Sequence, residues 1–199
     1  MAKEIWTEED AVADARAKHE REMVFPIGAP NDAFARYFIG QSYLAPLSTA
    51  QVGIYNVTFE PGCRNNWHIH HAKCGGGQIL VCVAGCGFYQ EEGKTAQELH
   101  PSDVVNIPAG VKHWHGAAPN SWFSHLAVEV PGAETANEWL EAVSDGEYFK
   151  ATGKLGRATA RPNEIPARDR RSRQTIRLPI PSGRYREPDC FMDIRIIPR

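Results

Sequence analysis

The chain has 199 residues, of which 42% are hydrophobic and 23% charged, with a formal net charge of −2. This length and composition predict one globular domain with a sizeable core and room for an extension. No apolar stretch approaches the roughly 18 residues of a membrane span, and the polar, acidic N-terminus is unlike a secretory signal. The five cysteines are an odd number without a CxxC pair, which favours reduced thiols. We therefore expect a cytoplasmic protein without a membrane partner.

The first predicted element is a helix over residues 8–21. Thr7, with Asp10 three residues later, is typical of a helix N-cap with an acidic first turn. The segment is only weakly amphipathic, so we expect a helical arm, residues 1–34, at the periphery of the protein.

From Ala35 onward the sequence is typical of β structure. Short runs rich in β-branched and aromatic residues are separated by glycine or proline turns at intervals of about ten residues. This spacing indicates an antiparallel sandwich or barrel. A short helix on the outside is expected at residues 137–145, which contain Trp139, Leu140 and Val143. The strand-like runs are ARYFIGQSYL, QVGIYNVTFE, QILVCVAG, CGFYQEEG, DVVNIPAG and WFSHLAVEV.

The charge is unevenly distributed along the chain. Residues 1–150 contain 10 basic and 19 acidic residues, whereas residues 151–199 contain 12 basic and 5 acidic ones. A basic stretch can bind nucleic acid, but this one lacks interleaved aromatic residues, so nucleic acid is not the expected partner. Residues 151–199 are interpreted as an Arg- and Pro-rich surface extension, or as sequence foreign to the domain. Two runs in it, QTIRLPI and FMDIRII, alternate enough to form edge strands.

Three of the eight histidines lie within four positions, in the run WHIHH. Side chains alternate between the faces of a strand, so His68 and His70 would point one way and His71 the other. Two imidazoles on one face can hold one metal ion, although such a pair also occurs on solvated faces. A later strand-turn brings His113 and His115 to one shared face in the same way.

The spacing of these residues resembles the two motifs of the cupin superfamily. The first motif is Gly, five residues, HxH, a few residues, Glu, six residues and Gly, which Gly62, the HxH pair, Gln78 and Gly85 follow. The second is Gly, five residues, PxG, two residues and His, which Pro108, Gly110 and His113 follow, 16 residues after the first motif. The resemblance implies an all-β cupin barrel, a double-stranded β-helix of jelly-roll type, over residues 35–150.

Three positions depart from the cupin pattern. Gln78 replaces the usual glutamate after a longer loop, Ser102 replaces the first glycine of the second motif, and Ala117 stands where asparagine is expected. Three neutral imidazoles and a neutral amide would leave a bound divalent ion with its full charge. That makes the ion a better Lewis acid and anion binder than it is beside a carboxylate ligand. Such nitrogen and oxygen ligands suit Mn, Fe, Ni, Co or Zn.

Within the cupins, the chain most resembles small bacterial cupins with glutamine in the ligand set. Some of these carry the name of carboxymuconolactone decarboxylases, and some are manganese-dependent hydroxynitrile lyases. The helical fold and cysteine chemistry of true decarboxylase domains are not seen in this sequence. The resemblance matches His125 to a histidine near the substrate, which implies general acid/base catalysis. It also implies one divalent metal ion, with manganese expected first, and the metal ligands His68, His70, Gln78 and His113.

Other histidines and cysteines have weaker signals. His115 is interpreted as a supporting or structural residue rather than a ligand, and His71 as a loop or surface residue. Cys74 lies in a glycine-rich loop where a soft metal is conceivable, whereas Cys82 and Cys86 are expected to pack as small hydrophobes. His19 and His100 carry no signal.

These features predict a metal-dependent lyase resembling hydroxynitrile lyases, with the metal as Lewis acid and His125 as acid/base. The expected substrate is a small organic molecule with a carbonyl, hydroxyl or carboxylate oxygen. The alternatives are a sugar-acid isomerase, a dioxygenase, or a non-catalytic ligand-binding or sensor barrel that contains a metal. The first 35 residues lack a helix-turn-helix, which favours the enzyme over the sensor. A homo-oligomer, either a dimer or a tetramer, is expected.

Overall fold

The computed structural model describes residues 7–153, within a unit of residues 1–156. The predicted extension, apart from its first three residues, lies outside the described residues, and so do its two candidate edge strands. In chain order the elements are α1 (Glu8–Glu22), β1 (Ala29–Pro30), the 3-10 helix η1 (Asp32–Tyr37), β2 (Phe38–Ile39), β3 (Ser42–Ser48), β4 (Ile54–Phe59), β5 (Arg64–Asn65), β6 (His68–His71), β7 (Cys74–Gly75), β8 (Gln78–Gly85), β9 (Gly87–Glu91), β10 (Gln97–Leu99), β11 (Val104–Ile107), β12 (His113–Ala117), β13 (Phe123–Glu129), β14 (Gly132–Ala133), β15 (Ala136–Trp139) and α2 (Asp145–Ala151).

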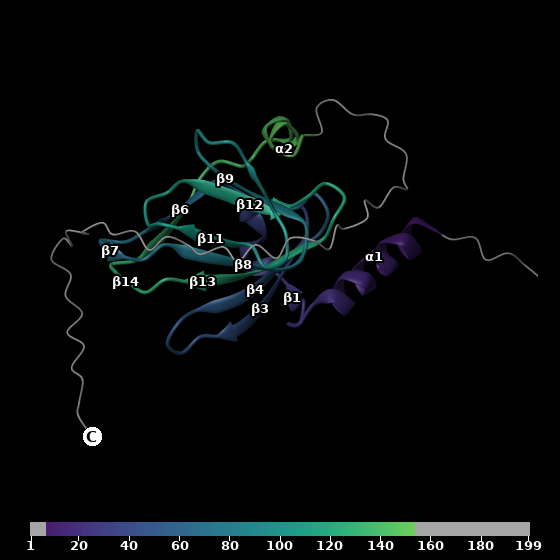
Figure 1. The fold of residues 1–199 in the computed structure, drawn as a ribbon, viewed down its shortest axis with the longest axis horizontal. Helices are drawn as coiled ribbons and strands as arrows, with labels where there is room; N and C mark the ends of the chain where they lie inside the picture. Colours follow the sequence, from purple (N-terminus) through teal and green to yellow (C-terminus); the bar gives the residue numbers. More distant parts are fainter. Residues whose placement is uncertain (1–6, 154–199) are drawn as a thin grey trace, which may run out of the picture. The chain divides into compact units, whose positions relative to one another are not determined.

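Two antiparallel sheets face each other and form the barrel (Figure 1). One sheet has the strand order β1-β3-β4-β13-β8-β11. The other has the order β10-β9-β12-β5-β2, and β6 joins it by pairing with β12 and β15. A small ladder links β7 to β14. The all-β, jelly-roll-type barrel predicted from the sequence is therefore confirmed.

The core of the barrel follows from the alternation along its strands. In β8 every second residue from Gln78 is buried and the residues between are half-buried, as the period of two predicts. Phe59, Leu80, Leu99 and Phe123 are all 0% exposed and belong to one apolar cluster. Burial of such side chains contributes about 1.5–3 kcal/mol each, and this cluster supports the strands that carry the histidines.

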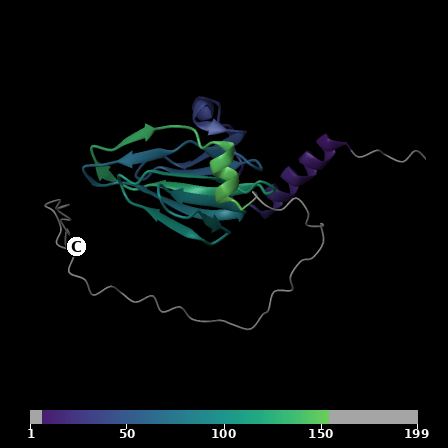
Figure 2. The same ribbon diagram turned by 90° about the horizontal axis from the view of Figure 1, so that it is seen from above.

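Helix α1 forms as predicted, and the Thr7–Asp10 pair is a capping box. Figure 2 shows the helix at one end of the barrel. The contact rests on His19, which is 4% exposed. Its Nε2 lies 2.8 Å from Ser124 Oγ in β13, and its ring stacks on Trp122 at a centroid distance of 5.7 Å. A histidine without a sequence signal thus anchors the helix to the barrel.

The short helix predicted after the barrel is present, but it lies at Asp145–Ala151 rather than at residues 137–145. Ala136–Trp139 is strand β15, which pairs with β6 so that Asn137 lies opposite His70. The ladder continues in the hydrogen bond from Leu140 N–H to Trp67 O. The apolar spacing favoured a helix, but long-range pairing occupies the backbone groups that a helix would need. Helix α2 begins after Ser144, which forms a capping box with Glu147.

The cysteines of the described region agree in part with the expectation of reduced thiols. Cys63, Cys82 and Cys86 are free, whereas Cys74 is disulfide-bonded, so the expectation of a reduced thiol is wrong for this residue. Cys82 is buried in the apolar cluster between the sheets, as predicted, and Cys86 is half-buried beside a second cluster that contains Trp67 and Phe88.

Between residues 7 and 153, no helix is long and apolar enough to cross a membrane.

Candidate metal centre

Five buried histidines gather from three strands on the inside of the barrel. His68 and His70 lie in β6, His113 and His115 in β12, and His125 in β13. Because β6 pairs with β12, His68 stands directly opposite His113, and their ring centroids are 4.1 Å apart.

The alternation predicted for β6 is confirmed. His68 is 2% and His70 is 9% exposed, whereas His71 points away and its Nε2 lies 2.7 Å from the Glu138 carboxylate. His71 is thus a surface residue, as expected, at the end of a strand rather than in a loop. The period of two therefore separates the inward pair from its outward neighbour.

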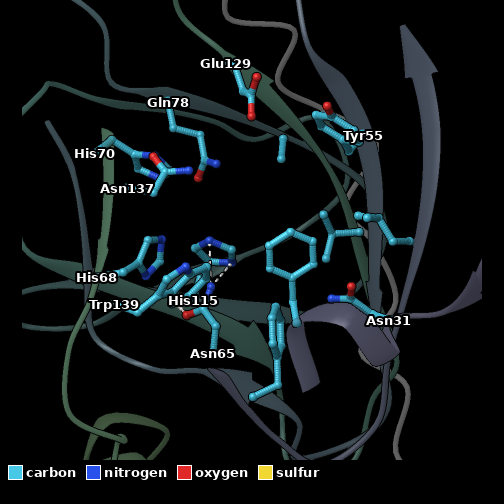
Figure 3. A pocket seen from close by; sticks show the side chains of 15 residues that line it. Asn31, Tyr55, Asn65, His68, His70, Gln78, His115, Glu129, Asn137 and Trp139 are labelled. Carbon is cyan, nitrogen blue, oxygen red and sulfur yellow. Dashed lines mark hydrogen bonds between the residues drawn. The ribbon is translucent and has the colours of Figure 1, made fainter. Parts of the chain in front are cut away.

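A cavity of about 230 Å³ opens beside this cluster. Figure 3 shows His70, Gln78 and Asn137 on one side of the cavity, with Asn31 and Tyr55 opposite. His115 lines the cavity, whereas His125 is 0% exposed and lies next to His115. Most of the remaining wall is apolar, contributed by Phe34, Phe38, Leu44, Tyr55, Val57, Ala127 and Trp139.

Hydrogen bonds at Nδ1 set the tautomer of three histidines. His68 Nδ1–H donates to Asn66 O at 3.0 Å and His113 Nδ1–H donates to Val111 O at 2.9 Å. His70 Nδ1–H donates to Asn137 Oδ1 at 2.7 Å. Since each neutral ring carries one proton, Nε2 of all three is left with a free lone pair. An unprotonated imidazole nitrogen of this kind is the form that binds a metal.

Three acceptor atoms in this region are buried without a partner, namely His70 Nε2, Gln78 Oε1 and His113 Nε2. A buried acceptor without a hydrogen bond costs free energy. A divalent cation would satisfy all three atoms at once, and nitrogen and amide oxygen are suitable donors for it. The residues present therefore fit a metal ion.

Burial keeps the cluster uncharged. It lowers the pKa of His113 to about 4 and holds the pKa of His68 well below its usual range, and the neighbouring histidines lower the pKa of His68 further. Burial also lowers the pKa of His70. Neutral imidazoles at pH 7 leave their lone pairs available, so no proton has to leave before a cation binds.

His115 and His125 form a hydrogen-bonded chain with Asn65. The His115 backbone N–H donates to Asn65 Oδ1 at 2.9 Å, which leaves Asn65 Nδ2 to donate to His115 Nε2 at 3.0 Å. His115 Nδ1–H can then donate to His125 Nε2, 3.1 Å away. Burial lowers the pKa of His125 to about 4 and that of His115 well below its usual range. This second group of histidines is therefore neutral as well and able to pass a proton along.

Two of the four predicted ligands, His68 and His113, belong to the group of three histidines whose ring nitrogens lie close together. His68, His113 and His115 each offer a nitrogen, and these three atoms lie within 4.8 Å of one another. His70 and Gln78 line the same cavity as His68 and His115. The geometry thus assembles all the predicted residues in one region and adds His115 to them.

Two asparagines of this site, Asn137 and Asn65, were not predicted from the sequence. Asn137 was missed because a helix was predicted at residues 137–145, whereas only a strand places this residue opposite His70. Asn65 precedes the WHIH run and is 1% exposed. Its position in a run of polar residues just before a metal-binding pattern was the available signal.

Similarity to known proteins shows the superfamily to which the chain belongs. No family model matches it. The (R)-mandelonitrile lyase of Granulicella tundricola is 43% identical over 118 residues, which cover 57% of this chain and 87% of that enzyme. The crystal structure of a cupin-like protein from Thermotoga maritima is 38% identical, with a TM-score of 0.57, and covers 67% of this chain and 98% of that one. The chain belongs to the cupin superfamily.

The five histidines of this cupin are buried inside the barrel. Its two motifs contribute β6, β8 and β12, and their pairing brings His68, Gln78 and His113 into one region. Because Gln78 stands where cupins usually have glutamate, none of the predicted ligands is a carboxylate. The cavity wall does contain one carboxylate, that of Glu129, which is exposed.

Proposed function

We propose that this cupin is a metal-dependent lyase that cleaves and forms cyanohydrins. The observation that carries the proposal is the set of buried, unpartnered acceptors, His70 Nε2, Gln78 Oε1 and His113 Nε2, beside an apolar cavity. The similarity to an enzyme named (R)-mandelonitrile lyase supports the reaction class.

The proposed metal ligands are His68, His70, Gln78 and His113. His115 is the competing candidate, because its nitrogen lies near those of His68 and His113. Both ring nitrogens of His115 already have partners in Asn65 and His125. His70 and Gln78 have the orphaned atoms instead, which supports their place in the ligand set. Manganese is the metal we propose, with Fe, Ni, Co or Zn as substitutes.

When bound, the cation supplies Lewis-acid stabilisation of negative charge on the substrate oxygen. His115 and His125 transfer the proton. In cleavage, His115 Nε2 exchanges its hydrogen bond from Asn65 for one from the substrate hydroxyl and takes the hydroxyl proton, while His115 Nδ1–H passes a proton to His125 Nε2. The bond to the nitrile carbon breaks, its electron pair leaves with cyanide, and the oxygen becomes a carbonyl. The proton then returns to cyanide, which leaves as hydrogen cyanide.

The cavity wall supports an uncharged, apolar substrate. Phe34, Phe38, Tyr55 and Trp139 present aromatic surface, which suits an aromatic or bulky alkyl aldehyde. The Glu129 carboxylate on the cavity wall disfavours a substrate that carries a carboxylate, because like charges repel. Both features argue for a cyanohydrin over a sugar acid, so the isomerase is the weaker candidate. A homo-oligomer and a cytoplasmic location remain predictions.

The test is release of aldehyde from mandelonitrile by the full chain, after chelation and then reloading with Mn²⁺. We expect turnover that needs the metal and that the exposed variant His71→Ala retains. Absence of turnover with mandelonitrile and with aliphatic cyanohydrins, in protein that holds one metal per chain, would refute the lyase and favour a binding or sensor barrel. Turnover of sugar acids instead would support the isomerase.

A further inference from the structure

A second group of metal-binding side chains lies on the outer face of the barrel. Cys86 follows β8, Glu98 lies in β10, and His100 follows β10. Their sulfur, carboxylate oxygen and ring nitrogen all lie within 4.8 Å of one another. Glu98 Oε1 stands between the other two, 3.3 Å from Cys86 Sγ and 3.5 Å from His100 Nε2.

The strand pattern places these side chains together. Glu98 and His100 are two residues apart on either side of Leu99, which is 0% exposed. Since a strand alternates its faces, Leu99 enters the core while Glu98 and His100 share the outer face. In the ladder between β10 and β9, Glu98 pairs with Phe88, two residues after Cys86.

The backbone at both ends of the group is held in place. Cys86 N–H donates to Trp122 O at 3.1 Å, and Cys86 O accepts from Ala118 N–H at 2.9 Å. His100 N–H donates to the Asp103 carboxylate at 2.8 Å, and His100 O accepts from Asp103 N–H at 3.0 Å. The three side chains therefore extend from fixed positions, which lowers the entropy lost when a cation joins them.

We propose that Cys86, Glu98 and His100 form a second divalent-metal site, selective for Zn²⁺ and similar borderline or soft ions. One sulfur, one nitrogen and one carboxylate oxygen are a donor set that suits zinc, and a water molecule would complete four-fold coordination. The interior site has no sulfur among its proposed ligands. The two sites should therefore differ in metal preference, with the thiol selecting the softer ion for the outer one.

The resting state of the thiol supplies a distinctive signature. A cysteine thiol has an ordinary pKa of about 8.5, so the metal-free thiol is mostly protonated at pH 7. A metal takes the thiolate, so the S–H bond must break and its proton must pass to solvent. Zinc binding at the outer site should release about one proton per ion, whereas the neutral interior histidines release none.

The test uses the full chain, kept reduced with a phosphine, and titrates it with Co²⁺ and Zn²⁺. We expect a near-ultraviolet thiolate-to-cobalt charge-transfer band, about two zinc ions per chain, and release of one proton for one of them. Cys86→Ser should lose the band, one zinc and the proton release. The exposed changes Glu98→Gln and His100→Asn, which leave the core untouched, should also lose one zinc. The matched control is His71→Ala, an exposed histidine outside the group.

The zinc that remains bound to these variants measures the occupancy of the interior site. A wild-type chain without the charge-transfer band under saturating Co²⁺ would overturn the proposal. A band that persists in Cys86→Ser would assign the thiolate to another cysteine and overturn it too. Unchanged zinc stoichiometry in both Glu98→Gln and His100→Asn would have the same consequence.

Discussion

His70 Nδ1 lies 2.7 Å from Asn137 Oδ1, across the ladder between β6 and β15. This bond keeps the His70 proton on Nδ1 and directs Nε2 toward the cavity. Partners of this kind typically contribute 10–100-fold to metal affinity.

Asn137→Ala should therefore weaken binding of Mn²⁺ by about 10–100-fold while the barrel remains folded. The measurement is calorimetric titration of the chelated protein. Asn106→Ala, which removes an exposed asparagine from β11, is the matched control. Equal affinities of the Asn137 and Asn106 variants would show that the hydrogen bond does not orient the ligand.

His125→Ala should keep the metal and the fold, yet lower the rate of cyanohydrin cleavage by about 10²–10⁴-fold, the usual contribution of general acid/base catalysis. His125 holds the position to which His115 Nδ1–H can pass a proton. Single-turnover kinetics and metal analysis of the same samples give both quantities. Gln78→Glu adds a charge beside the cation and should lower the rate less steeply. An unchanged rate in His125→Ala would remove this residue from the proton pathway.

Gly77→Ala should displace Gln78. Gly77 has a φ of +90°, and a Cβ there would clash with Ile107 O. The left-handed backbone alone costs a non-glycine residue about 1–2 kcal/mol, and the clash adds to that cost. Gly93→Ala is the control, because Gly93 has a φ of +75° with nothing within 4 Å. Urea unfolding and metal titration should show a larger loss of stability, and weaker metal binding, for Gly77→Ala alone.

Acid should loosen helix α1 through His19. Burial disfavours the charged imidazole and lowers the pKa of His19 in the folded state, whereas the unfolded value is near 6.5. Below about pH 6.5 the unfolded state binds the additional proton, so stability falls as the pH drops toward the folded pKa. The stabilising contribution is complete above that range. Urea unfolding of the metal-free protein at pH 7 and pH 5 measures the loss.

His19→Gln cannot titrate, so its stability should fall less between pH 7 and pH 5 than that of the wild type. At pH 7 the variant should lose about 1 kcal/mol, the usual contribution of one hydrogen bond. His71→Ala serves as the exposed control. Parallel pH profiles for wild type and His19→Gln would contradict a role for this histidine.

A chain that ends at residue 153 should fold and keep its metal, whereas one that ends at residue 143 should not be stable. Tyr148 of α2 is 1% exposed, and its hydroxyl donates to Ala117 O at 2.7 Å. Its ring also lies under the Arg64 guanidinium, at 4.5 Å from the centroid. Loss of a large buried aromatic costs about 3–5 kcal/mol.

Melting temperatures and metal content of the two truncated chains measure this difference. A large loss of stability on removal of residues 154–199 alone would show that the basic extension belongs to the fold. Equal stability of the two truncated chains would show that α2 is dispensable.

Features that depend on near neighbours in the chain could be predicted from the sequence. Alternation along β6 and β8 placed His68 and His70 on one face and Gln78 with Leu80 and Cys82 on another. Thr7 and Asp10 marked the start of α1. Each of these follows from a local period or a local hydrogen bond, which a short stretch of residues specifies without help from the rest of the fold.

The contacts between residues distant in the chain could not be predicted in this way, because they depend on how the strands pair. Residues 136–139 became a strand because β6 offered hydrogen-bond partners, and that pairing brought Asn137 to His70. Strand pairing also placed His115 on the cavity wall with His125 beside it, and the packing of helix α1 on the barrel buried His19 against Ser124. A shift of one residue in a strand would exchange the inward and outward faces. Such pairings are set by the packing of the whole barrel, so the local pattern that reveals a histidine does not reveal its partner.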